Sequence, residues 1–88
     1  MPPNARATAE GPLQGLTVGQ AARVSAVHDA HAGDAIARRL RELGFVPGEQ
    51  VRVLAHGPLG GEPILVQVGF TRFALRRAEA ERVRVVAP

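Results

Sequence analysis

Five short stretches of this chain alternate apolar and polar residues with a period of two. They are residues 22–28, 50–56, 64–68, 72–76 and 82–86. A period of two indicates β-strands that bury one face, because successive side chains of a strand point to opposite sides. Short strands with one polar face are typical of an antiparallel sheet that is wet on one side. The pattern therefore limits the chain to a small, mainly β fold.

The alternation also predicts which side chains face the core. On the first two strands these are Ala22, Val24 and Ala26, followed by Val51, Val53 and Ala55.

One long helix is predicted between the first and second strands. Asp34 is a suitable N-cap, and Ile36, Leu40 and Leu43 recur at the spacing of one helical face. Gly44 follows as a residue that tolerates the left-handed backbone found after helix C-termini. We therefore expect an amphipathic helix that turns the Ile36, Leu40 and Leu43 stripe toward the sheet.

The connections between these elements are short. Residues 57–63 (GPLGGEP) read as the hairpin loop between the second and third strands, and residues 77–81 are long enough for one helical turn before the last strand. Five short strands in this arrangement leave the fewest unpaired backbone groups at the sheet edges when they curl into a small, partly open barrel that the helix covers. Side chains fill the interior of such a barrel, so we expect no buried substrate pocket of about 300 Å³ or more.

The first twelve residues carry no large apolar side chain beyond Met1. We expect residues 1–12 to be a disordered tail and residues 13–88 to form a single domain. No window approaches the ~18 consecutive apolar residues of a membrane helix, and the N-terminus lacks the pattern of a signal peptide. These features predict a cytoplasmic protein that does not insert into a membrane.

Composition argues against several kinds of chemistry. The chain has no cysteine and no lysine, and all eleven of its basic residues are arginine. This excludes disulfides, thiolate metal sites, a P-loop lysine and a Schiff base. Ser25 is the sole serine and lies in a predicted strand, and no spacing suggests paired carboxylates. We expect a protein that is not an enzyme and that requires no cofactor.

Arg38, Arg39 and Arg41 lie in the predicted helix, off its apolar stripe. A nucleic-acid surface would combine a positive stripe with aromatic stacking platforms. The chain has three phenylalanines, no tyrosine or tryptophan, and a net charge of only +3. We interpret the arginines as a solvated face and expect no nucleic-acid partner.

One segment resembles a metal site. In residues 28–34 (HDAHAGD), His28 and His31 could bind a divalent cation together with Asp34, or with Asp29, if the loop curls. Imidazole and carboxylate ligands suit Zn²⁺ or Fe²⁺. The alternative is that these residues are ordinary surface histidines and a helix cap.

Two apolar residues fall outside the alternation. Leu59 lies at the tip of the 57–63 loop, where flanking glycines would hold it out as an anchor for a pocket on a partner. Phe70 lies in the turn between the third and fourth strands, and we expect it to fill a gap in the core. Leu43, Phe45 and Arg76 are the other candidates for contact with a partner.

Several motifs in order resemble the FeoA family of bacterial ferrous iron transport proteins. A helix ending in a Leu-Gly-aliphatic-x-Pro-Gly turn is followed by a strand, an acidic-Pro pair, and Leu-Arg and Glu-Ala segments. Here these residues are Leu43, Gly44, Pro47 and Gly48, then Glu62 and Pro63, then Leu75 and Arg76, and finally Glu79 and Ala80. The chain departs from the pattern at Phe45, where a smaller aliphatic residue is expected, and at Glu62, where Asp is commoner.

The resemblance implies an SH3-like barrel and an accessory role beside the Fe²⁺ permease of the FeoB type, which bears a cytoplasmic GTPase domain. The expected action is to bind the cytoplasmic part of the permease and to modulate transport or GTP hydrolysis. One alternative is a freestanding metal-responsive module related to the C-terminal domain of iron-dependent repressors. Another is an oligomerisation domain that pairs through its edge strands or through metal.

Overall fold

The computed structural model describes residues 10–88, so most of the predicted tail lies outside the described residues. The end of that tail is structured. Strand β1 (Gly11–Pro12) pairs antiparallel with strand β6 (Val83–Val86), so the folded domain begins before the predicted start at Leu13. A two-residue strand held by backbone pairing leaves no periodic pattern of side chains, and the sequence therefore did not indicate it.

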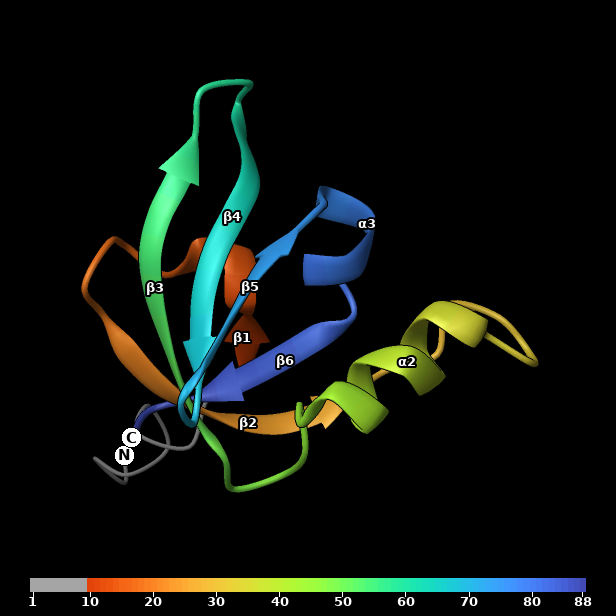
Figure 1. Ribbon diagram of the computed structural model, residues 1–88. Coiled ribbons are helices and arrows are strands. Elements are labelled where there is room, and N and C mark those ends of the chain that lie inside the picture. Colours follow the sequence, from red (N-terminus) through yellow and green to blue (C-terminus); the bar gives the residue numbers. More distant parts are fainter. Residues whose placement is uncertain (1–9) are drawn as a thin grey trace, which may run out of the picture.

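The five predicted strands are confirmed. They are β2 (Ala21–Val27), β3 (Gln50–Gly57), β4 (Gly61–Val68), β5 (Thr71–Leu75) and β6. Together with β1 they form one antiparallel sheet in the order β1-β6-β2-β3-β4-β5, with β1 and β5 at its edges. Figure 1 shows this sheet bent around a common interior, with β3 and β4 crossing the direction of β2 and β6. The described residues thus form the expected mainly β, non-closed barrel.

Two of the three register shifts in the sheet change which of the predicted residues face inward. The pairing of β2 with β6 slips between Val24 and Ala26, and Val27 is buried where the alternation predicted Ala26. The pairing of β3 with β4 slips after Val53, and Ala55 is exposed. A bulge inserts one extra residue and so moves every later side chain to the other face, which a strict period of two cannot anticipate.

Helix α2 (Ala35–Leu43) begins and ends where the capping residues predicted, with Gly44 in the left-handed conformation at φ 118°. Its buried residues are Ala37 and Leu40, whereas Ile36 and Leu43 of the predicted stripe are each 38% exposed. The helix projects to the side of the sheet and packs against β2 and the short helix α3 (Arg77–Ala80) (Figure 1). This narrow contact buries less of the helix than a full amphipathic face would.

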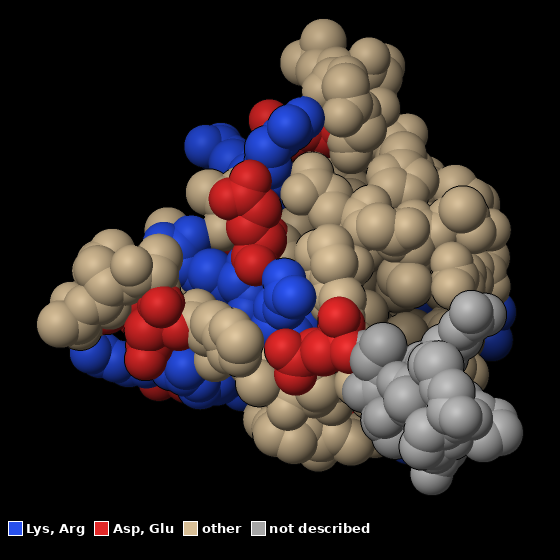
Figure 2. Space-filling model, turned by 180° about the vertical axis from the view of Figure 1, so that it is seen from behind, with Lys and Arg blue, Asp and Glu red and all other residues tan. Residues whose placement is uncertain are grey.

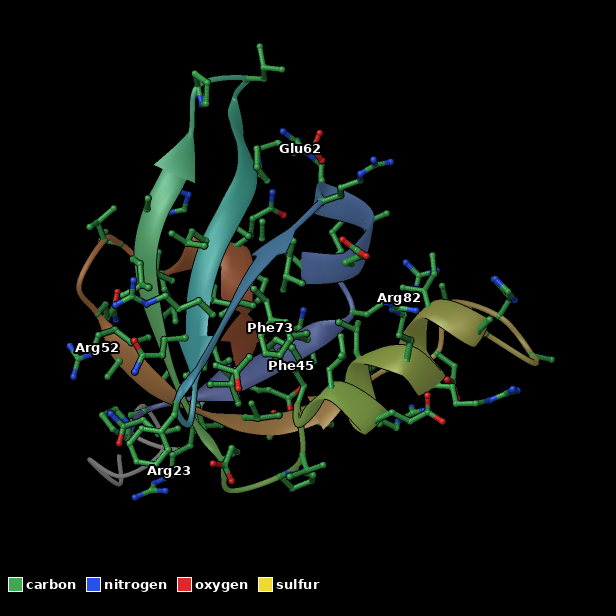
Figure 3. The ribbon with its side chains drawn as sticks, in the orientation of Figure 1. Arg23, Phe45, Arg52, Glu62, Phe73 and Arg82 are labelled. Carbon is green, nitrogen blue, oxygen red and sulfur yellow. The ribbon has the colours of Figure 1, made fainter. Side chains whose placement is uncertain are left out.

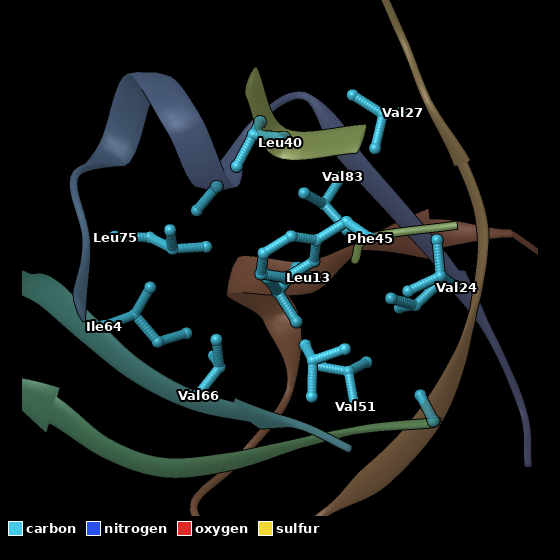
Figure 4. Close-up of a cluster of buried hydrophobic side chains, with 14 of the residues drawn as sticks. Leu13, Val24, Val27, Leu40, Phe45, Val51, Ile64, Val66, Leu75 and Val83 are labelled. Atoms are coloured by element: carbon cyan, nitrogen blue, oxygen red, sulfur yellow. The ribbon is translucent and has the colours of Figure 1, made fainter. Parts of the chain in front are cut away.

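The interior is filled by apolar side chains from all parts of the domain (Figure 4). A 3-10 turn, η1 (Leu13–Gly15), contributes the fully buried Leu13. The buried apolar residues are Leu13, Ala22, Val24, Val27, Ala37, Leu40, Phe45, Val51, Val53, Ile64, Val66, Val68, Leu75, Ala80, Val83 and Val85. Within residues 10–88, no helix has the length and apolar character needed to cross a bilayer.

Candidate functional site

Asp34, one of the three predicted metal ligands, is committed to the fold. Its oxygens accept hydrogen bonds from the backbone N–H groups of Ala30, Ile36 and Ala37 and from Nε of Arg82, which lies 2.6 Å away. Its side chain is only 1% exposed. The Arg82 guanidinium, reinforced by these backbone donors, holds the pKa of Asp34 well below its ordinary value. Asp34 therefore caps α2 and ties it to the residue before β6.

The two histidines are not grouped with Asp34 in the structure. His28 and His31 are both exposed, and Nδ1 of His31 lies 3.1 Å from the carbonyl oxygen of Ala32. Asp29, the alternative carboxylate, forms an ion pair with Arg41 at 3.1 Å. Across residues 10–88, no three His, Asp or Glu side chains are grouped so that they could hold a metal ion together. The described residues therefore do not gather the predicted ligands into one metal site.

The arginine face of α2 carries charges of both signs. Besides its ion pair with Asp29, Arg41 donates from Nη2 to the carbonyl oxygen of Val27 at 2.6 Å. Figure 2 shows blue and red side chains interleaved on the side of the molecule that α2 occupies, rather than one field of positive charge. This arrangement is typical of a solvated helix face.

Leu59 stands at the tip of the β3–β4 hairpin with 78% of its surface exposed. The backbone N–H of Leu59 donates to the carbonyl of Glu62, and the N–H of Glu62 donates back to the carbonyl of Leu59, so the tip has a defined conformation. The predicted exposure of Leu59 is thus found in the structure.

Contacts between the hairpin and α3 hold the tip in place. The carboxylate of Glu62 accepts the backbone N–H of Arg77 at the start of α3. In return Nη2 of Arg77 donates to the carbonyl of Gly60 at 3.3 Å. The sequence does not indicate this contact, because Glu62 and Arg77 are 15 residues apart. In the structure, Glu62 links the hairpin to α3 and so supports the tip that carries Leu59.

The other three candidates for partner contact do not gather around Leu59. Arg76 is exposed and lies beside the hairpin support, where its backbone N–H donates to Oε1 of Glu79 at 2.7 Å. Leu43 lies at the C-terminal end of α2, far from the hairpin tip (Figure 1). The prediction that Phe45 contacts a partner is wrong as to its location: Phe45 is 0% exposed, and its ring lies tilted against that of Phe73 with the centroids 5.4 Å apart (Figure 3).

Phe70 also departs from expectation. It lies in the two-residue turn between the paired residues Val68 and Thr71 and is fully exposed, at 104%. A tight turn at the end of a hairpin projects its side chains beyond the sheet, so no core gap is within reach.

A hollow of about 310 Å³ lies on the surface between β1, η1 and the ends of β2 and β6. No titratable side chain lines it, and among its lining residues are Leu16, Gln20, Ala21 and Val86. It therefore offers no side-chain acid, base or nucleophile. Ser25, for its part, donates from Oγ to the carboxylate of Glu10 at 2.6 Å.

Comparisons with known proteins agree with this fold. The family model described as the FeoA domain matches residues 11–87. The crystal structure of FeoA from Stenotrophomonas maltophilia complexed with zinc is 65% identical over 85% of this chain and 88% of that one, with a TM-score of 0.79. It is described as a prokaryotic SH3 domain protein proposed to act as a ferrous iron transport activating factor. No curated protein sequence matches the chain.

Two more distant structures extend the comparison. The FeoA protein from Chlorobium tepidum is 38% identical over 88% of this chain and 70% of that one, with a TM-score of 0.75. A manganese-dependent transcriptional repressor has a TM-score of 0.79 at 21% identity over 92% of this chain and 43% of its own, a likeness that shows the fold alone. The predicted SH3-like architecture is confirmed. The family match over residues 11–87 and the 65% identity to a known FeoA show that this chain belongs to the FeoA family.

Proposed function

We propose that this chain is a non-enzymatic, cytoplasmic accessory protein of ferrous iron uptake. In this proposal it binds the cytoplasmic part of an Fe²⁺ permease of the FeoB type and modulates transport or GTP hydrolysis. Support comes from membership of the FeoA family and from the description of the Stenotrophomonas protein as a proposed activating factor.

The observation that carries the proposal is the supported, exposed Leu59. A large apolar side chain that is 78% exposed on a hairpin costs little entropy to bury in a partner, because the Glu62–Arg77 contacts already order its support. Arg76, exposed beside that support, could contribute a charged contact at the rim. Leu43 lies too far away to belong to the same contact and is a weaker candidate.

The proposal is tested with the full chain and the soluble GTPase domain of the permease, by calorimetry with and without nucleotide. Leu59→Asp should weaken binding about 10- to 30-fold, the loss typical of a buried apolar anchor. Val18→Asp is the matched control, because Val18 is 59% exposed and belongs to the loop before β2, which lies away from the hairpin tip (Figure 1). Equal affinities for Leu59→Asp and the unmodified chain would refute the role of the hairpin tip.

The zinc in the Stenotrophomonas structure favours one alternative, a freestanding metal-responsive module. In this chain that function would rest on His28 and His31, because hydrogen bonds occupy the oxygens of Asp34. Calorimetric titration with Zn²⁺ and Fe²⁺ tests it. The alternative requires binding that is lost in the double variant His28→Ala/His31→Ala, and binding that survives in that variant would refute these two residues as ligands.

A further inference from the structure

The outer face of the sheet carries arginines that have no acidic partner. Arg23 on β2, Arg52 on β3 and Arg72 on β5 are exposed, and none of them forms an ion pair with any residue of the described part of the chain. Strands β2, β3 and β5 contain no Asp or Glu. The single acid of β4, Glu62, is bonded to the backbone of Arg77. The positive charge on this face is therefore not neutralised by the sheet itself.

The register places two of these arginines in one row. Arg52 pairs with Gln67, and Gln67 pairs with Arg72, so the three side chains lie side by side across β3, β4 and β5. Neighbouring strands are about 4.8 Å apart, so the backbones of the two arginines are about 10 Å apart. We call these three residues the arginine row. On the next strand, β2, Ala21 pairs with Arg52 and Arg23 pairs with Gln50, so Arg23 lies on the same face but two residues along the strand from the row.

A second row on the same face is apolar. Ala55 pairs with Leu65, and Leu65 pairs with Ala74, across the same three strands. Leu65 is half-buried and is not among the side chains that pack on the core. It lies two residues before Gln67 on β4, a separation of about 7 Å. The face thus presents an apolar row parallel to the arginine row.

Two of the arginines are held in a fixed orientation. Nη1 of Arg52 donates to the carbonyl of Gly19 at 2.6 Å, and Nη1 of Arg23 donates to the carbonyl of Gly48 at 2.7 Å. Figure 3 shows both side chains pointing away from the core. Each guanidinium keeps further N–H donors for a ligand, and its anchoring reduces the entropy lost on binding.

A shallow hollow and an exposed aromatic ring border the arginine row. The hollow, about 110 Å³, is lined by Arg52, Gln67 and Gly69 together with Gln50 and Glu49, and Glu49 supplies its single carboxylate. Nε2 of Gln67 donates to the carbonyl of Gly69 at 3.1 Å, which ties the row to the turn that carries the fully exposed Phe70. Exposed aromatic residues beside arginines are common in protein interfaces.

We propose that this face binds an acidic amphipathic helix of a partner protein. Carboxylates on one side of the helix pair with Arg52 and Arg72, its apolar stripe covers Leu65, and Phe70 contacts its edge. Helix on sheet is a standard packing of two layers. The face spans about 14 Å from β2 to β5, which about ten helical residues cover at 1.5 Å each. The apolar row favours a protein partner over a nucleic acid, because phosphates make no favourable contact with the apolar side chain of Leu65.

The experiment uses the full chain and two fluorescent 14-residue peptides in anisotropy titrations at low and moderate salt. One peptide places Glu on one flank and Leu on the adjacent face of a helix, and the other scrambles the same composition. We expect the amphipathic peptide to bind at least fivefold more tightly than the scrambled one. In Arg52→Gln/Arg72→Gln its affinity should fall about five- to tenfold, the loss of two exposed ion pairs.

The control, Arg38→Gln/Arg39→Gln, removes the same charge from α2 and should change the affinity less than twofold. Leu65→Ser, checked for folding by circular dichroism, should also weaken binding. The proposal would be overturned if the two peptides bound equally, or if the two double variants lost the same affinity. It would also be overturned if oligo-dT or anionic vesicles bound more tightly than the amphipathic peptide. This surface is separate from the hairpin tip, so a negative result with Leu59→Asp leaves it standing.

Discussion

Replacing Phe45 tests whether this residue serves the core or a partner. Its side chain is completely buried at the centre of the barrel and packs against the ring of Phe73. Truncation of a fully buried phenylalanine to alanine typically costs about 3–5 kcal/mol. A domain of this size is stable by roughly 5–10 kcal/mol. Phe45→Ala should therefore lose at least about a third of its stability, and up to all of it.

A milder variant keeps this prediction measurable. Phe45→Leu retains most of the apolar volume and loses chiefly the aromatic contact with Phe73, so we expect a loss of about 1–2 kcal/mol. The chain has no tryptophan or tyrosine, so urea unfolding is followed by far-UV circular dichroism. With a slope of about 1 kcal/mol per molar urea, the midpoint should fall by about 1–2 M.

The matched control is Val46→Ala, because Val46 is the next residue and is 41% exposed. Its midpoint should move by less than about 0.5 M. An unchanged midpoint for Phe45→Ala, or equal shifts for Val46→Ala and Phe45→Leu, would refute the assignment of Phe45 to the core.

Three further predictions follow from single contacts. The fold lowers the pKa of Asp34 below its ordinary value of 3.8, so the carboxylate stabilises the fold above about pH 4 and this stabilisation is lost as the pH falls further. The thermal unfolding temperature of Asp34→Asn should therefore depend less on pH, between pH 5 and pH 2, than that of the unmodified chain. Gly44→Ala should lower stability by about 1–2 kcal/mol in urea titrations, because Gly44 has φ 118°, whereas Gly11→Ala should have little effect. Glu62→Gln weakens the bond to the backbone N–H of Arg77, so that amide should exchange with deuterium about three- to tenfold faster, and no change would argue against the hairpin support.

The strands and the long helix could be predicted because their signals are local. A period of two and a pair of capping residues depend only on near neighbours in the chain, and β2 to β6 and α2 lie where these signals placed them. The bulges in β2 and β3 could not be predicted in the same way. A bulge is a property of two paired strands, and neither strand alone carries its signature.

The candidate site shows the same division. Leu59 was expected to be exposed because glycines flank it, and it is. Phe45 and Phe70 were assigned to the wrong environments, since both lie outside regular elements and no periodicity places them. Burial of such a residue depends on which other segments pack over it: the core covers Phe45, and no segment of residues 10–88 covers Phe70.

The sequence by itself determined that short alternating strands and one capped helix make a small barrel without cysteine or lysine chemistry, because composition and periodicity are properties of the chain alone. Only the tertiary structure decided the uses of the polar residues. Asp34 accepts a hydrogen bond from Arg82, which is 48 residues away, and Glu62 accepts one from the backbone of Arg77. The arginine row exists only because the register of β3, β4 and β5 aligns its residues. Hydrogen bonds and ion pairs act over a few ångströms, so they depend on which distant segments the fold brings together.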